Sequence, residues 1–256
     1  MPGALRLAAI GAADAVRHVL CQVHPKATVR AHSMAAILEL LSRLLDKLGA
    51  AARAARAAEG DLWPVSAAHI SAAIVAVLPG ELATHAESEV GKASAKVVSG
   101  DERGGLVMTT KLLRPAISAA LTVPGANEPD EKAMTAAAAA LEYLCAEIWE
   151  LAGSAAQDKL RSSPGGGGCA STSAEPILIV PDDLRRAILK DEELASLGLF
   201  RAPPAAATPG VRGCSARDEG SGVGLRRGGG RGPPVALARP RKRRGGVWLG
   251  GPWYLA

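Results

Sequence analysis

Hydrophobic residues recur every three or four positions along several stretches of the chain, which is the spacing of an amphipathic α-helix. The clearest stretch is 141–158, LEYLCAEIWELAGSAAQD. At about 100° per residue, its apolar side chains fall within an arc of roughly 120°. Glu142, Glu147 and Glu150 point the other way. This pattern predicts a helix that buries one face and leaves a row of carboxylates in water.

The first half of the chain has four such stretches, and the second of them is long. Helices are predicted at residues 12–23, 31–59, 66–78 and 81–98. Pro25 ends the first, because the residue before a proline avoids helical geometry. Ser66 can cap the third helix, and Pro79-Gly80 separates it from the fourth. The predicted order is short, long, short, followed by an extra helix.

The second half repeats this order after a charged, glycine-containing connector at 99–110. Helices are predicted at residues 111–123, 131–159 and 181–190. Pro115 either shortens the first of these helices or lies in its first turn, and Pro181 suits the start of the last one. The loop at 162–174 contains four consecutive glycines, but no Gly-Lys-Ser/Thr follows them, so a flexible loop is favoured over a phosphate cradle.

Composition supports a helical protein and gives no sign of catalysis. Hydrophobic residues make up 48% of the chain and aromatic residues only 3%, which favours helices packed by small and aliphatic side chains over a β-sandwich. The four cysteines form no CxxC pair, so we expect unpaired thiols and no zinc site. The five histidines are dispersed and no GxSxG or HExxH motif is present. We therefore expect no enzyme, no cofactor and no metal, and no apolar run is long enough for a membrane span.

Charge is distributed unevenly along the chain. Residues 201–256 contain eleven basic and two acidic residues, a net charge of +9, which leaves −4 for residues 1–200 because the whole chain carries +5. This tail is rich in Pro, Gly and Arg, so we expect it to be disordered when free. Its most basic run contains Arg239, Arg241, Lys242, Arg243 and Arg244. The run can serve as a nuclear import signal, as a DNA-binding arm or as a solubilising charge run.

Several strings resemble core histones. Gln22-Val23-His24-Pro25, Ser33-Met34 and residues 78–89, LPGELATHAESE, are similar to core histone 2B. The helix at 141–158 and residues 190–194, KDEEL, closely resemble core histone 2A. The two resemblances cover roughly residues 11–100 and 111–200. Together they resemble the fused 2B–2A histone doublets that some large DNA viruses encode.

The resemblance implies an all-α chain with two tandem histone folds, at 1–100 and 101–200, that pair as an intramolecular heterodimer. One histone fold cannot bury the apolar face of its long helix alone. Tethering two folds makes their pairing intramolecular, at an effective concentration often on the order of millimolar.

The function implied by the resemblance is structural. The protein would package viral DNA in nucleosome-like particles, through phosphate neutralisation and DNA bending rather than base contacts. Its partner would be a doublet or dimer resembling histones 3 and 4, in the host nucleus or viral factory and in the virion. The alternative is a histone-fold transcription regulator that acts at particular genes.

The resemblance also implies two kinds of site. Outside the tail, the candidate residues for contact with double-stranded DNA are Lys26, Arg30, Arg114, Lys159 and Arg161. An ordinary surface charge is the alternative for each of these five residues. Eight carboxylates match an acidic patch where arginine-bearing chromatin factors dock: Glu81, Glu89, Glu142, Glu147, Glu150, Asp191, Glu192 and Glu193. A plain solvated face is the alternative for these carboxylates. The family is basic where this chain has Glu128, Leu178, Asp182 and Asp183, so we expect its folded part to hold DNA more weakly.

Overall fold

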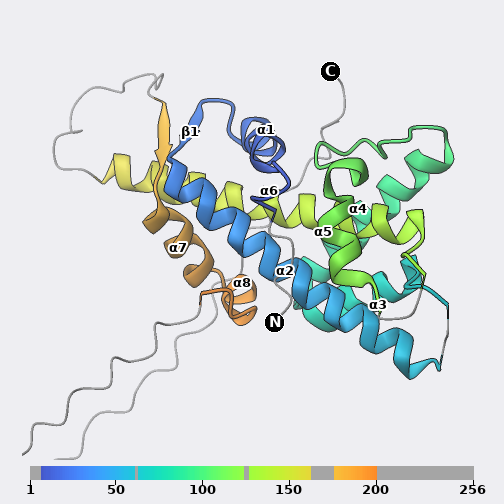
Figure 1. Ribbon diagram of the computed structural model, residues 1–256. Helices are drawn as coiled ribbons and strands as arrows, with labels where there is room; N and C mark the ends of the chain where they lie inside the picture. Colours follow the sequence, from blue (N-terminus) through green and yellow to red (C-terminus); the bar gives the residue numbers. More distant parts are fainter. Residues whose placement is uncertain (1–6, 61–62, 124–126, 163–175, 201–256) are drawn as a thin grey trace, which may run out of the picture. The chain divides into compact units, whose positions relative to one another are not determined.

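The computed structural model describes residues 7–60, 63–123, 127–162 and 176–200. These residues form eight helices and two short strands (Figure 1): α1 Ala13–Val23, β1 Ala27–Val29, α2 Ala31–Ala58, α3 Ala67–Val77, α4 Gly80–Val98, α5 Thr110–Leu121, α6 Glu131–Arg161, β2 Ile177–Ile179, α7 Pro181–Lys190 and α8 Glu192–Ser196. The predictions of a flexible glycine-rich loop and of a disordered basic tail fall largely or wholly on residues outside the described ranges.

The all-α prediction is confirmed, because helices dominate the described residues and the strands have three residues each. Every predicted helix is present, with its ends within two residues of the expected positions. Both predictions for Pro115 are wrong, because it lies beyond the first turn of an uninterrupted α5. The helix continues through the proline because the exposed Pro115 stands beside Ala116 and Ile117, which are buried in the core.

The long helix α6 lies at the centre of the core. It contacts helices from both halves of the chain, namely α1, α2, α3, α4, α5 and α7. Every residue from 133 to 142 is buried, and the alanines at 136–140 let neighbouring helices approach α6 closely on several sides. The described residues consequently form one compact unit, with a core to which both halves contribute.

Two glycines mark close contacts between the halves. A Cβ added to Gly49 on α2 would lie 2.6 Å from the backbone oxygen of Ala120 on α5. Gly153 on α6 lies against the ring of His24, whose Nε2 is 3.2 Å from the backbone oxygen of Glu150. A larger side chain at Gly49 would force α2 and α5 apart, because it would meet the backbone of Ala120, whereas one at Gly153 would displace the ring of His24.

The strands β1 and β2 join two loops that are far apart in the sequence. They pair in parallel, with Thr28 opposite Leu178. The backbone N–H of Arg30 donates to the oxygen of Ile179 at 3.4 Å, and the hydroxyl of Ser33 donates to the same oxygen at 3.0 Å. Because α2 begins after β1 and α7 begins after β2, the pair brings the N-termini of these two helices to one end of the unit (Figure 1).

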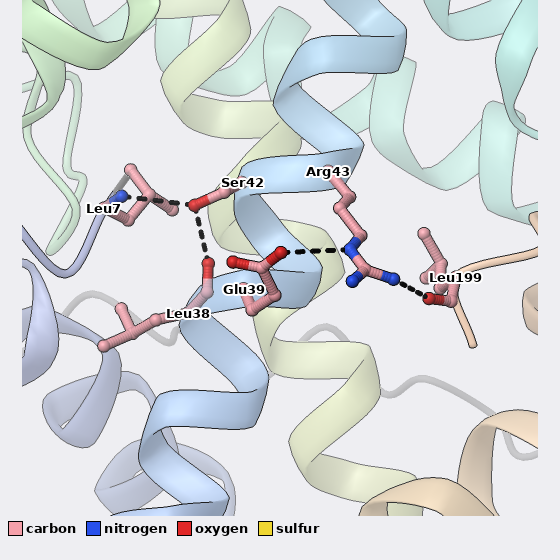
Figure 2. A network of polar contacts seen from close by, with 6 residues as sticks. All are labelled: Leu7, Leu38, Glu39, Ser42, Arg43 and Leu199. Atoms are coloured by element: carbon pink, nitrogen blue, oxygen red, sulfur yellow. Dashed lines mark hydrogen bonds and ion pairs between the residues drawn. The ribbon is translucent and has the colours of Figure 1, made fainter. Parts of the chain in front are cut away.

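Both ends of the described chain are held at the middle of α2 (Figure 2). The backbone N–H of Leu7 donates to Ser42 Oγ at 3.2 Å, and this hydroxyl donates to the oxygen of Leu38 at 2.7 Å. On the next residue, Arg43 Nη1 donates to the oxygen of Leu199 at 2.8 Å. The middle of α2 therefore anchors the segments before α1 and after α8.

Candidate nucleic-acid interface and acidic surface

Two predicted DNA-binding residues, Lys26 and Arg30, flank β1 and are exposed. Arg30 also precedes the first turn of α2, and no side chain caps that turn. The first N–H groups of a helix lack partners within the helix and carry a partial positive charge, which favours a phosphate nearby. We call Lys26, Arg30 and the paired strands the β-pair end. Side-chain cations thus lie beside a helix N-terminus at this end.

The last turn of α6 carries two further candidates, Lys159 and Arg161, and both are exposed. Helix α6 contacts β2, and its last turn lies towards the β-pair end (Figure 1). Exposed Arg185 and Arg186 on α7 add two cations within three turns of β2, and the sequence reasoning missed them. The adjacent Arg-Arg pair after Pro181 was the signal that could have identified them.

Arg114 on α5 has a different environment from the other DNA-binding candidates. Its guanidinium donates to the carboxylate of Glu131 and lies 3.7 Å from a carboxylate oxygen of Glu128. The hydrogen bond and the charge of Glu131 raise the pKa of Arg114 above its usual value. Two carboxylates therefore offset the charge of Arg114, which makes it a poorer phosphate ligand than Lys26 or Arg30.

The departures from the histone pattern have distinct structural roles. Leu178 on β2 is 43% exposed at the β-pair end, and Asp182 is exposed in the first turn of α7. Asp183 is buried, and its Oδ2 accepts the backbone N–H of Val180 at 3.0 Å. Asp183 thus closes the N-terminus of α7, whereas Leu178 and Asp182 present apolar and negative groups to solvent. The basic run at 239–244 lies outside the described residues.

The eight predicted docking carboxylates come from α4, α6 and α8 and from Asp191, which directly precedes α8. Helix α4 packs against α6, and Glu193 on α8 contacts the start of α4. Glu81, Glu150 and Glu192 are exposed, whereas Glu89, Glu147, Asp191 and Glu193 are partly buried. The structure therefore places these carboxylates on elements that touch. We call the seven carboxylates other than Glu142 the acidic surface.

Glu142 does not belong to the exposed row of carboxylates, and its predicted position in water is wrong. Its side chain is only 8% exposed, and its Oε2 accepts the backbone N–H of Met108 at 2.7 Å. Burial raises the pKa of Glu142 from 4.5 to about 7, although backbone N–H groups of Met108 and Val107 act in the opposite direction. Glu142 instead anchors the connector between the two halves to α6.

Asp191 and Glu193 accept hydrogen bonds from helix N-termini. Asp191 Oδ1 accepts the N–H groups of Glu193 and Leu194, at 3.1 and 3.0 Å, and so caps α8. The carboxylate of Glu193 accepts the N–H groups of Glu81 and Leu82, at 3.1 and 3.2 Å. Periodicity could not have identified these roles, because they depend on how α8 approaches α4.

Neither a membrane span nor a metal cluster was found in the part of the chain that the structure describes. Within residues 7–60, 63–123, 127–162 and 176–200, no helix is long and apolar enough to cross a bilayer. The His, Cys, Asp and Glu side chains of the same ranges form no group of three that could hold a metal ion. In comparisons with known proteins, no protein-family model and no curated protein matches the chain.

Proposed function

We propose that the protein is a histone doublet that packages DNA without sequence specificity. The carrying observation is the β1–β2 pair, which joins the loop before the long helix of the first half to the loop before the last short helix of the second. In each half, a long helix of 28 or 31 residues lies between shorter ones. Two tandem histone folds, paired through their loops and crossed long helices, account for this arrangement.

In this proposal, DNA phosphates bind at the β-pair end. Lys26 and Arg30 supply charge there, and the first turn of α2 supplies backbone N–H groups. Such groups contact phosphates and carry no base readout, which supports packaging of any sequence. Leu178 adds no charge at this end and Asp182 adds a negative one, and we propose that the basic tail at 201–256 supplies part of the DNA affinity.

The acidic surface is the proposed docking site for arginine-bearing chromatin factors. Glu150 and Glu192 are exposed, and the α4–α6 contact and the Glu193 hydrogen bonds hold their helices beside α4. An arginine binds two carboxylate oxygens in a forked geometry, which makes a cluster of carboxylates a better site than a single one.

A second proposed partner is a doublet or dimer resembling histones 3 and 4. Trp63, just before α3, is 74% exposed, and Val75 on α3 is 61% exposed. Between them, Ala68 and Ala72 are also exposed, so a partner helix could approach α3 closely. Burial of this apolar side would favour assembly, and the complex would act on DNA in the host nucleus or viral factory and in the virion.

Replacing both Lys26 and Arg30 by alanine should weaken DNA binding and flatten its dependence on salt. Each lost phosphate contact removes about 0.9 from the slope of log affinity against log salt concentration, so the double variant should lose roughly 1.8. Fluorescence anisotropy with duplex DNA at several salt concentrations measures the slope.

The matched control for this experiment replaces Lys47 and Lys190, which are exposed, by alanine. Lys47 lies more than four helical turns from the start of α2, and Lys190 is the last residue of α7, far from β2. The control changes the net charge equally and should retain most of the wild-type slope. Equal slopes for the two double variants would contradict phosphate binding at the β-pair end.

A further inference from the structure

The second part of the connector, residues 104–109 between α4 and α5, is packed against the core. Leu106 and Met108 are buried, and Met108 has no exposed surface. A Cβ added to Gly104, whose φ is +62°, would lie 3.1 Å from the backbone oxygen of Ala93, so the connector passes close to α4. This segment therefore covers part of the core without forming a helix or a strand.

Glu142 on α6 lies against this segment and holds its backbone. The Oε2 atom of Glu142 accepts the N–H of Met108 at 2.7 Å, and the N–H of Val107 also favours the carboxylate. Both donors belong to the connector, whereas α4 and α6 are long helices that pack against each other. Displacing a short segment without helical hydrogen bonds costs less than separating packed helices. Water therefore reaches Glu142 most readily when the connector moves.

The groups around Glu142 make its charge sensitive to pH near neutrality. Burial is the largest effect and raises the pKa of Glu142 from 4.5 to about 7. The connector N–H groups and Lys96 on α4 lower this pKa, whereas Glu89 on α4 raises it. Cys145, which follows Glu142 by three residues on α6, adds no charge in this range because burial raises the pKa of its thiol as well. The proton on Glu142 thus stabilises the closed connector fully below pH 4.5, and this stabilisation is lost as the pH rises through about 7.

We propose that Glu142 and the connector form a pH-sensitive latch, in which ionisation of Glu142 releases residues 104–109 while α4 and α6 stay folded. The protonated side chain tolerates burial, and its oxygen still accepts the N–H of Met108. The ionised side chain gains from contact with water, which the closed connector excludes. Release uncovers Leu106 and Met108, so the latch exposes an apolar segment as the pH rises. Because burial of these two side chains favours closure, the open form is a minor population.

The test measures the protection of backbone amides against hydrogen exchange in the full-length protein between pH 5 and pH 8. Protection is the rate in an unstructured peptide divided by the rate in the protein, so the intrinsic effect of pH on exchange cancels. In the wild type, protection of the Met108 amide should fall on the order of 50-fold over this range, because the pKa of Glu142 is 4.5 when it is solvated and about 7 when it is buried.

Two glutamine variants show which carboxylate is responsible. Glu142→Gln carries no charge, so protection at Met108 should change by no more than about twofold across this range. The matched control, Glu150→Gln, removes an exposed carboxylate from the same helix and should follow the wild type. Ile148, which is buried on α6, should keep its protection in the wild type and in both variants.

A further variant, Met108→Ala, keeps Glu142 and removes a buried side chain that holds the connector closed. Protection of the amide at this position should fall by at least about tenfold at every pH, since truncating a buried methionine is costly. The dependence of the protection on pH should match that of the wild type, because the titrating carboxylate is unchanged.

Three results would overturn the latch. Protection of the wild-type Met108 amide that does not change with pH would show that ionisation does not release the connector. An equal fall in Glu142→Gln would assign the pH dependence to another group. A parallel fall in the protection of Ile148 would show that α6 unfolds together with the connector.

Discussion

Replacing Glu142 by glutamine should stabilise the protein at pH 8 by as much as about 3 kcal/mol. The carboxylate is buried, and burial raises its pKa from 4.5 to about 7. A shift of this size corresponds to roughly 3 kcal/mol at about 1.4 kcal/mol per pH unit. Glutamine keeps an oxygen that can accept the N–H of Met108 and removes the buried charge. Urea denaturation followed by circular dichroism measures the difference.

The same substitution should remove a specific pH dependence. Because the folded pKa of Glu142 is above its unfolded value, its proton binds more tightly in the folded chain. The stabilisation from this proton is therefore complete below pH 4.5 and is lost as the pH rises through about 7. Neighbouring Glu89 raises the pKa further and Lys96 lowers it, and both remain in the variant.

We expect the stability of the wild type to fall relative to that of Glu142→Gln between pH 5 and pH 8. The control is Glu150→Gln, which removes an exposed carboxylate from the same helix and should follow the wild type. If the free energies of unfolding of the wild type and Glu142→Gln differ by a constant amount across this pH range, the Glu142 side chain is not buried as described.

Truncating Trp149 to alanine should lower the free energy of unfolding by about 3–5 kcal/mol, the usual cost of removing a fully buried aromatic side chain. Trp149 on α6 is fully buried, and its Nε1 donates to the backbone oxygen of Val16 on α1 at 3.2 Å. Since this side chain joins the second half to the first, both halves should lose stability together and unfold in one transition. Urea denaturation followed by circular dichroism tests both points.

The exposed tryptophan provides the control for this experiment. Trp63 is 74% exposed, so Trp63→Ala should change the stability by no more than about 0.5 kcal/mol. Two separate unfolding transitions in Trp149→Ala, one for each half, would contradict a shared core. If Trp149→Ala lowers the free energy of unfolding as little as Trp63→Ala does, the result would contradict the burial of Trp149.

Helices α1 to α7 could be predicted from the sequence because each stretch repeats its apolar positions and ends at Pro, Gly or a polar residue, whereas the five-residue α8 was not predicted. The β1–β2 pair could not, because each strand has three residues and its partner is about 150 residues away. The interior position of Pro115 also escaped prediction, since it depends on burial of its neighbours in the folded core.

The exposed loop positions of the candidate site could be predicted from the sequence. The contacts that depend on how the helices pack could not. Lys26 and Arg30 are exposed beside the strand pair, at a loop that the resemblance identified. Glu142 was placed in water because periodicity assigns a polar face to α6, whereas the connector covers that face at Met108. The cap made by Glu193 requires the folded approach of α8 to α4, which no local pattern reports.

The most direct test of DNA packaging combines the protein with core histones 3 and 4 on two DNA fragments of unrelated sequence and digests the complexes with micrococcal nuclease. Packaging through phosphate contacts predicts a discrete protected length that is the same on both fragments and that is lost when this protein is omitted. Protection of one fragment only, at a particular sequence, would contradict packaging and favour a regulator of particular genes. Absence of any protected length would contradict the proposal that this chain forms a nucleosome-like particle.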